Sequence, residues 1–169
     1  TSKTITFNVS PLNDAPELTG TPTEFLNGRE DTTYTITKAQ LLEGFTDAEF
    51  DTLSIPGDVT SDVPGTIISY DNATQTYSIT APLNYSGLIN LSYQVSDGLL
   101  SAEATQSFTL NQVNDAPELT GTPAEFLDGR EDTTYTITRT ELLQGFTDAE
   151  EDALSISGDV TSDVPGTII

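Results

Sequence analysis

The sequence predicts an all-β protein made of tandem β-sandwich modules, each about a hundred residues long. The segment N-D-A-P-E-L-T-G starts at Asn13 and again at Asn114, so the chain repeats with a period of 101 residues. A period of this length is the size of one small domain. Short runs in which apolar and polar residues alternate follow the first copy of the segment. Clusters of Gly, Pro, Asn and Asp separate these runs, as turns do.

The repeat divides the chain into one whole module and two partial ones. Residues 13–113 form the complete module, and residues 114–169 are expected to be the first part of a following, truncated module. Residues 1–12 match the last strand of a preceding module, because Phe7 falls on Phe108 at the same offset. We therefore expect the chain to be a window from a longer array.

Six short segments of the complete module have the pattern of strands. In the first of them, alternation places Tyr34 and Ile36 on one face, which is typical of a half-buried strand. Asp71 and Asn72 begin a turn between two of the segments and make them a hairpin. Six or seven strands in about a hundred residues indicate an antiparallel β-sandwich of immunoglobulin-like type. The expected strands are residues 32–37, 53–55, 66–70, 76–80, 88–95 and 101–110.

One short helix per module is expected, at residues 38–43 of the complete copy. Thr37 has the position of its N-cap, and Gln40 stands three residues later, as a capping box requires. A glycine follows where the helix would end. The helix should carry Leu41 and Leu42 into the core.

The charge of the chain excludes several classes of partner. With 27 acidic and 5 basic residues its net charge is −22, so we expect neither nucleic acid nor an anionic membrane surface as a partner. The chain has no Cys and no His, which excludes disulfides, the usual zinc sites and Ser-His or Cys-His nucleophiles. No apolar run approaches the length that spans a membrane, so no membrane insertion is expected in this segment.

The acidic loop after the helix is the first candidate site. Asp47, Glu49 and Asp51 alternate with other residues, so their carboxylates would converge on one side of an extended loop. Carboxylates held close together repel one another unless a cation lies among them. Hard oxygen ligands of this kind select Ca²⁺, or Mg²⁺ less well.

This loop has two other interpretations. The first is a solvated acidic turn without a ligand. The second is an EF-hand, which we reject because Thr52 stands where that loop needs Gly and no helices flank it. In the later copy the same acids recur as Asp148, Glu150 and Asp152, while Glu151 replaces Phe50. A position that accepts either Phe or Glu should face solvent.

The strand order suggests which residues meet at each end of the module. Two predicted strands run into the Asp47 loop and into the Asp97-Gly98 turn, so both should lie at the end where Asn13 and Asp14 enter. Glu30 precedes the first of these strands and should lie at the opposite end, near the second linker. Each junction would then combine groups from two neighbouring modules.

The sequence resembles a known family, the cadherin-like tandem repeats of large bacterial surface proteins, including the extender regions of RTX-type adhesins. The resemblance rests on N-D-A-P at the junction, E-D-T from Glu30 and D-A-E-F-D-T-L-S-I from Asp47. It continues through Y-S-I-T-A-P-L-N-Y-S-G from Tyr77 and S-Y-Q-V-S-D-G from Ser92. It covers the complete copy from end to end. One departure is that animal cadherins carry an L-D-R-E motif where this chain reads P-L-N-Y-S-G.

The resemblance implies that calcium ions bind at the junctions between modules. The implied ligands are Asn13, Asp14, Asp47, Glu49 and Asp97 at the first junction, and Glu30, Asn114, Asp115, Asp148 and Glu150 at the second. The local spacing adds Asp51 and Asp152.

These observations support a structural function. We expect a calcium-rigidified spacer in a long secreted or cell-surface adhesin, whose partners are the neighbouring modules of the same chain. The alternative is a cadherin-like binding module that makes homophilic or carbohydrate contacts, for which Tyr85 is the candidate loop aromatic. An enzyme is not expected, because small repeated sandwiches offer no cleft and the acids lie at predicted junctions.

Overall fold

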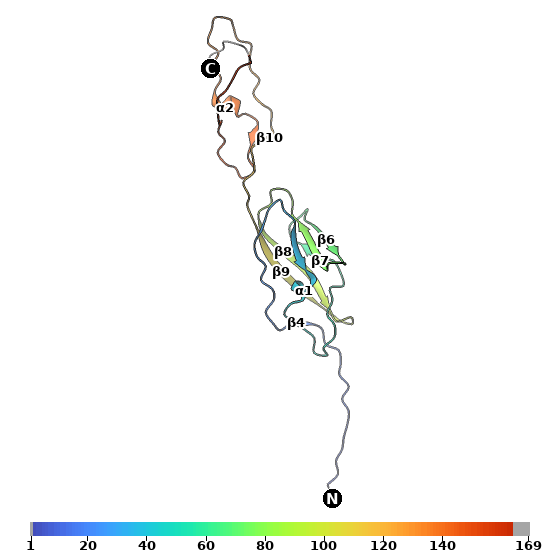
Figure 1. Ribbon diagram of the computed structural model, residues 1–169. Helices are drawn as coiled ribbons and strands as arrows, with labels where there is room; N and C mark the ends of the chain where they lie inside the picture. The colour runs from blue at the N-terminus through green and yellow to red at the C-terminus, as the bar shows by residue number, and fades with distance from the viewer. Residues whose placement is uncertain (1, 164–169) are drawn as a thin grey trace. The chain divides into compact units, whose positions relative to one another are not determined.

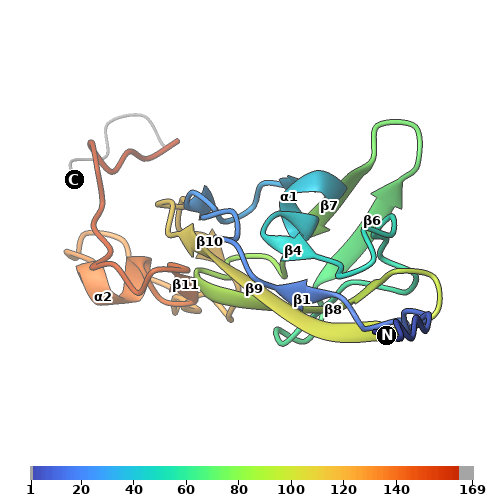
Figure 2. The same ribbon diagram turned by 90° about the horizontal axis from the view of Figure 1, so that it is seen from below.

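The computed structural model describes residues 2–163 and divides the chain into two compact units, Thr1–Val113 and Asn114–Ile169. We call them unit 1 and unit 2 and describe each by itself (Figure 1). Unit 1 contains two main sheets. Strands β6 and β7 lie in a layer separate from β8 and β9 (Figure 2). The all-β sandwich predicted from the sequence is confirmed.

The larger sheet of unit 1 has four strands in the order β2 (Gly28–Arg29), β9 (Ser101–Asn111), β8 (Gly87–Ser96) and β5 (Thr60–Ser61). β8 and β9 form a long antiparallel hairpin. β2 pairs with β9 in parallel, which corrects the prediction of a wholly antiparallel sandwich. The reason is that both strands run toward the end of the unit where the chain leaves. The pairing continues past β2, since the N–H of Glu30 donates to the carbonyl of Asn111 at 3.0 Å.

The smaller sheet has three strands in the order β3 (Tyr34–Thr37), β7 (Thr76–Thr80) and β6 (Ile67–Asp71). All its pairs are antiparallel. The predicted hairpin is present, and Asp71 caps its turn by accepting from the N–H of Ala73 at 2.8 Å.

The expected strand at residues 53–55 is reduced to a single bridge between Ser54 and Ser96. These residues exchange two backbone hydrogen bonds of 2.8 Å. The next hydrogen-bonded pair of an antiparallel ladder would involve residue 56. Pro56 has no N–H to donate, and the ladder stops there.

The predicted helix is α1 (Lys38–Leu42), one residue shorter than expected. Its capping box forms as predicted, with the Thr37 hydroxyl accepting from the N–H of Gln40 and the Gln40 side chain accepting from the N–H of Thr37. Glu43 already has extended backbone angles and is the C-cap. Leu41 is fully buried, and Leu42 packs against the core with part of its surface exposed.

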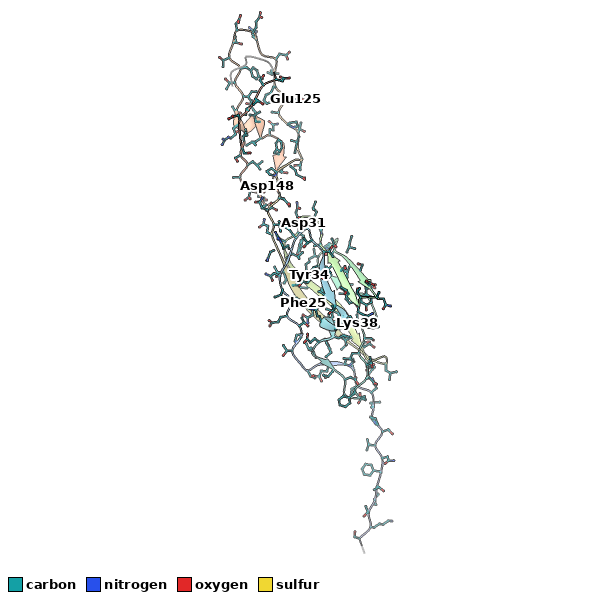
Figure 3. All side chains as sticks on the ribbon, viewed as in Figure 1. Phe25, Asp31, Tyr34, Lys38, Glu125 and Asp148 are labelled. Carbon is teal, nitrogen blue, oxygen red and sulfur yellow. The ribbon has the colours of Figure 1, made fainter. Side chains whose placement is uncertain are left out.

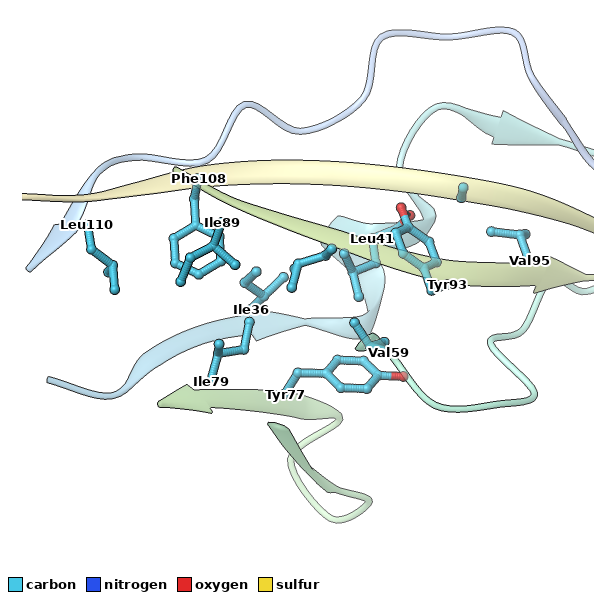
Figure 4. Close-up of a cluster of buried hydrophobic side chains, with 12 residues drawn as sticks. Ile36, Leu41, Val59, Tyr77, Ile79, Ile89, Tyr93, Val95, Phe108 and Leu110 are labelled. Carbon is cyan, nitrogen blue, oxygen red and sulfur yellow. Dashed lines mark hydrogen bonds between the residues drawn. The ribbon is translucent and has the colours of Figure 1, made fainter. Parts of the chain in front are cut away.

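The core lies between the two main sheets and under α1 (Figure 4). Each large apolar side chain removed from water contributes about 1.5–3 kcal/mol. The hydroxyl of the buried Tyr93 donates to the carbonyl of Leu41 at 2.8 Å and ties the helix to β8. The buried apolar residues are Ile36, Leu41, Val59, Tyr77, Ile79, Ile89, Leu91, Tyr93, Val95, Ala104, Phe108 and Leu110.

Unit 2 reproduces β1, α1 and β4 of unit 1. Its strands β10 (Glu118–Leu119) and β11 (Phe146–Thr147) pair antiparallel, and α2 (Arg139–Leu142) has a capping box. Ile137 is 42% exposed, whereas the matching Ile36 is 1% exposed. In unit 1, Ile36 pairs with Tyr77 of β7 and belongs to the core.

Residues 2–12 form no strand, and their apolar side chains Ile5, Phe7, Val9 and Leu12 are exposed. Their assignment to a preceding module therefore stays a prediction, as do the boundaries of the three modules. Within residues 2–163, no helix is both long and apolar enough to cross a membrane.

Candidate functional site

Two short strands bring the first linker alongside the acidic loop. β1 (Glu17–Leu18) pairs with β4 (Phe45–Thr46) in antiparallel register. The hydroxyls of Thr19 and Thr46 lie 2.8 Å apart beside this pair. The linker residues that precede β1 are thereby held next to the loop that follows β4. We call this end of unit 1 the entry end, made of residues 13–17, 46–51 and 97–100.

The acidic loop is a tight turn and not the extended segment that the sequence suggested. The Oδ1 atom of Asp47 accepts from the N–H of Glu49 at 3.0 Å and from the N–H of Asp51 at 2.9 Å. Phe50 has a φ of 65°, which turns the chain back, and its side chain is 94% exposed. The prediction that position 50 faces solvent is confirmed. Asp47 stabilises the turn through the two hydrogen bonds that its Oδ1 atom accepts.

The second carboxylate oxygen of Asp47 is the chemically distinctive atom of the entry end. Asp47 is 8% exposed, and its buried Oδ2 atom has no hydrogen-bond partner among residues 2–163. A buried polar atom without a partner costs about 1–3 kcal/mol, and more when it carries charge. A cation beside this oxygen would remove that cost.

The linker Asn is hydrogen-bonded to the turn after β8. The side-chain amide of Asn13 donates to Oδ2 of Asp97 at 2.9 Å. The other oxygen of Asp97 accepts from the N–H groups of Leu99 at 2.6 Å and Leu100 at 2.7 Å. These backbone donors, Leu100 first, together with the Asn13 amide, hold the pKa of Asp97 below its usual 3.8. The aspartate is therefore strongly ionised at neutral pH.

The linker Asp contributes its backbone to the same end. The N–H of Asp14 donates to Oε2 of Glu49 at 3.1 Å. Asp14, Glu17, Asp47 and the two threonine hydroxyls line a hollow of about 540 Å³ beside the linker. Glu17 was not among the predicted site residues. Its place in the repeated N-D-A-P-E segment was the signal that could have identified it.

Glu30 lies at the opposite end of unit 1, as predicted. It is 1% exposed, and its Oε1 atom accepts from the N–H of Val113 at 2.6 Å. Asp31, the next residue, lies at the end where the chain leaves the unit (Figure 3). A buried carboxylate is thus fixed to the last residue of unit 1.

Unit 2 repeats the same pattern at its own first linker. The N–H of Asp115 donates to Oε2 of Glu150 at 2.9 Å, and the Asn114 side chain donates to the carbonyl of Asp115 at 2.8 Å. Oδ1 of Asp148 accepts from the N–H groups of Glu150 at 3.1 Å and Asp152 at 3.0 Å. Asp148 is half-buried, more open than the matching Asp47 of unit 1.

The predicted ligands are brought together in part. Asn13, Asp14, Asp47, Glu49 and Asp97 meet at the entry end, while the side chain of Asp51 is exposed. Among residues 2–163, no three acidic side chains lie close enough to hold a metal ion as they stand. Chemically, this end of unit 1 can offer hard oxygen ligands once its side chains release their internal donors.

A family model for a cadherin-like domain matches residues 12–111 and again residues 113–169. No curated protein matches. Two solved structures are similar. The first is the endo-fucoidan hydrolase MfFcnA4 from glycoside hydrolase family 107, with 21% identity over 59% of this chain and 14% of that chain, and a TM-score of 0.39. A variant of the same enzyme shows 22% identity over 88% of this chain and 22% of that chain, with a TM-score of 0.43.

The family match covers almost the whole chain and agrees with its sandwich fold. Cadherin-like domains are non-enzymatic modules that are typically extracellular and have adhesive or structural functions. This chain belongs to the cadherin-like domain family.

Proposed function

We propose that the chain is part of a calcium-rigidified spacer in a long secreted or cell-surface adhesin of the RTX type. Calcium ions would bind where one module joins the next and fix the angle between the two. The single observation that carries this proposal is the buried Oδ2 atom of Asp47 at the entry end, for which the described part of the chain supplies no hydrogen-bond partner. Bound Ca²⁺ supplies positive charge and a shell of about six to eight oxygen ligands.

The loop around Asp47 is built to keep its shape while one oxygen stays available. Oδ1 of Asp47 is used twice by backbone N–H groups, so the carboxylate cannot turn away from its buried position. Oδ2 is therefore held ready for a cation. Rigidity of this kind reduces the entropy lost when the site fills.

The neighbouring groups would have to turn to complete the site. Oε2 of Glu49 would leave the N–H of Asp14, and the Asn13 amide would present its oxygen where it now donates to Asp97. These are exposed or half-buried side chains, so their rotation requires no change in the core. The carboxylates of Asp47, Glu49 and Asp97 repel one another at the entry end. This repulsion weakens once they share a cation.

The hydrogen bonds of the linkers suggest how calcium could limit bending between modules. Asn13 and Asp14 are hydrogen-bonded to unit 1 through Asp97 and Glu49. Glu30 holds the N–H of Val113, the residue just before Asn114 and Asp115. A calcium ion shared between such a linker and the modules on its two sides would reduce its freedom to bend. Extracellular modules need only weak sites for this, with dissociation constants of about 10⁻⁴–10⁻³ M.

A thermal titration of the whole chain tests the proposal. At ten to a hundred times the dissociation constant, one calcium ion stabilises the folded state by about 1.4–2.7 kcal/mol. The melting temperature should rise by several degrees when EDTA is replaced by millimolar CaCl₂, at matched ionic strength. Mg²⁺ should raise it less, since it demands stricter octahedral geometry. Identical melting temperatures in EDTA and CaCl₂ would overturn the proposal.

A further inference from the structure

A second hollow of unit 1 lies away from the entry end, between the smaller sheet and the segment before β5. Its volume is about 330 Å³, which is in the range of small-ligand sites. Apolar side chains form part of its wall. One positively charged and one negatively charged residue also line it. The lining residues used below are Lys38, Pro56, Asp58, Ile68, Tyr70 and Tyr77.

Two tyrosines give the hollow an aromatic wall. Tyr70 on β6 lies directly opposite Tyr77 on β7, and their ring centroids are 4.5 Å apart with an interplanar angle of 36°. Tyr77 is 5% exposed and belongs to the core, whereas Tyr70 is 39% exposed. The buried ring thus fixes the orientation of the exposed one. A fixed exposed ring costs little conformational entropy when a ligand packs on it.

The two charged groups at the hollow are not used by the protein. Within residues 2–163, neither the ammonium of Lys38 nor the carboxylate of Asp58 makes a hydrogen bond or an ion pair. Lys38 (Figure 3) begins α1 and Asp58 lies in the loop before β5, so the backbone of each is anchored. The ammonium offers three donors and the carboxylate only acceptors. Their charges cancel.

We propose that this hollow, which we call the tyrosine groove, binds a single neutral pyranose ring of a glycan. A pyranose has one face of C–H groups and a rim of hydroxyls that both donate and accept hydrogen bonds. The C–H face matches the negative face of the Tyr70 ring. The hydroxyl rim matches one donor group and one acceptor group at the same wall.

The charge of the chain decides between kinds of sugar. With a net charge of −22, the chain repels an anionic sugar at long range. Lys38 and Asp58 line the groove with opposite charges, so the groove itself offers no net attraction to a carboxylate or sulfate. A neutral sugar meets neither obstacle.

Titration of the isotope-labelled whole chain in EDTA, followed by amide NMR, tests this inference independently of calcium. The probes are the methyl glycosides of glucose, galactose and mannose. At least one should shift the amides of Lys38, Asp58 and Tyr70, with a dissociation constant of about 1–10 mM. Tyr70→Ala should weaken binding tenfold or more. Lys38→Gln and Asp58→Asn should each weaken it severalfold.

Matched variants and probes keep the test decisive. Phe50→Ala removes another exposed aromatic ring and should leave sugar binding unchanged. The amide spectrum of each variant reports whether unit 1 is folded, and the two charge variants serve if Tyr70→Ala is not. The proposal is overturned if no methyl glycoside shifts these amides. Equal affinity in Tyr70→Ala, tighter binding of methyl glucuronide, or binding of a proline-rich peptide in place of sugars would also overturn it.

Discussion

The side-chain amide of Asn13 donates a 2.9 Å hydrogen bond to the carboxylate of Asp97, although 84 positions separate the two residues. This bond joins the linker before the module to the turn between β8 and β9. It therefore places a linker residue and a turn residue at one end of the sandwich. The predictions below concern this end, the turn that supports it and the core beneath it.

Acid should weaken the link between Asn13 and Asp97. The pKa of Asp97 is lower when folded, so its contribution to stability is present above about pH 4 and is lost as the pH falls through the lower, folded value. Asp97→Asn should lower the melting temperature at pH 7 and flatten its dependence on pH below 4. If the melting temperature of this variant falls with pH below 4 as steeply as that of the wild type, other groups cause the loss of stability in acid.

Asp47→Asn should change stability in opposite directions without and with calcium. In EDTA the variant keeps the oxygen that caps the turn and removes a buried charge that has no partner, so stability should stay equal or rise by about 1 kcal/mol. In CaCl₂ it should lose most of the gain shown by the wild-type chain. Asp58→Asn alters an exposed acid away from the entry end and is the control. Parallel behaviour of the two variants would contradict the special role of Asp47.

Gly44→Ala should disrupt the strand pair that holds the linker. Gly44 has a φ of 86°, and a Cβ there would lie 3.0 Å from the carbonyl carbon of Thr21. Its own carbonyl accepts from the N–H groups of Thr19 and Gly20. The cost should be about 1–3 kcal/mol by denaturant unfolding. Gly57→Ala, where an added Cβ meets nothing within 4 Å, should be near neutral. Equal effects at both positions would contradict this account.

Tyr93 should make the module sensitive to alkali. Burial raises the pKa of Tyr93 to about 12 from 10.0, so its contribution to stability is complete below pH 10 and declines as the pH rises through the folded value. Tyr93→Phe removes the bond to the Leu41 carbonyl and should cost about 1 kcal/mol at pH 7. The variant should also lose less stability than the wild type between pH 10 and pH 12. If the variant loses as much stability as the wild type between pH 10 and pH 12, other tyrosines cause the loss of stability in alkali.

Local patterns in the sequence were sufficient to predict features whose structure depends on one short segment. The capping box at Thr37 depends only on residues three apart, and the exposure of Phe50 followed from its exchange with Glu in the later copy. The proximity of Asn13 and Asp97 followed from the directions of the predicted strands, which place both residues at the same end of the module. Each of these inferences needs no knowledge of side-chain geometry.

Other features depend on contacts that no local pattern reveals. The turn at Asp47 requires a left-handed backbone at Phe50, a conformation that bulky residues adopt rarely. The parallel pairing of β2 with β9 joins segments more than seventy residues apart. The strand expected at residues 53–55 is reduced to a bridge at Ser54, and Pro56 in the sequence is the signal that no ladder continues there.

The most direct test of the spacer proposal is the distance between two modules in a tandem protein that carries residues 13–113 twice. Because the natural chain has no Cys, a single cysteine at the exposed position Asn72 of each copy accepts a spin label selectively. Pulsed electron paramagnetic resonance then gives the distribution of distances between the labels. We expect a broad distribution in EDTA and a narrow one in CaCl₂. Distributions of equal width in the two solutions would contradict a calcium-rigidified junction.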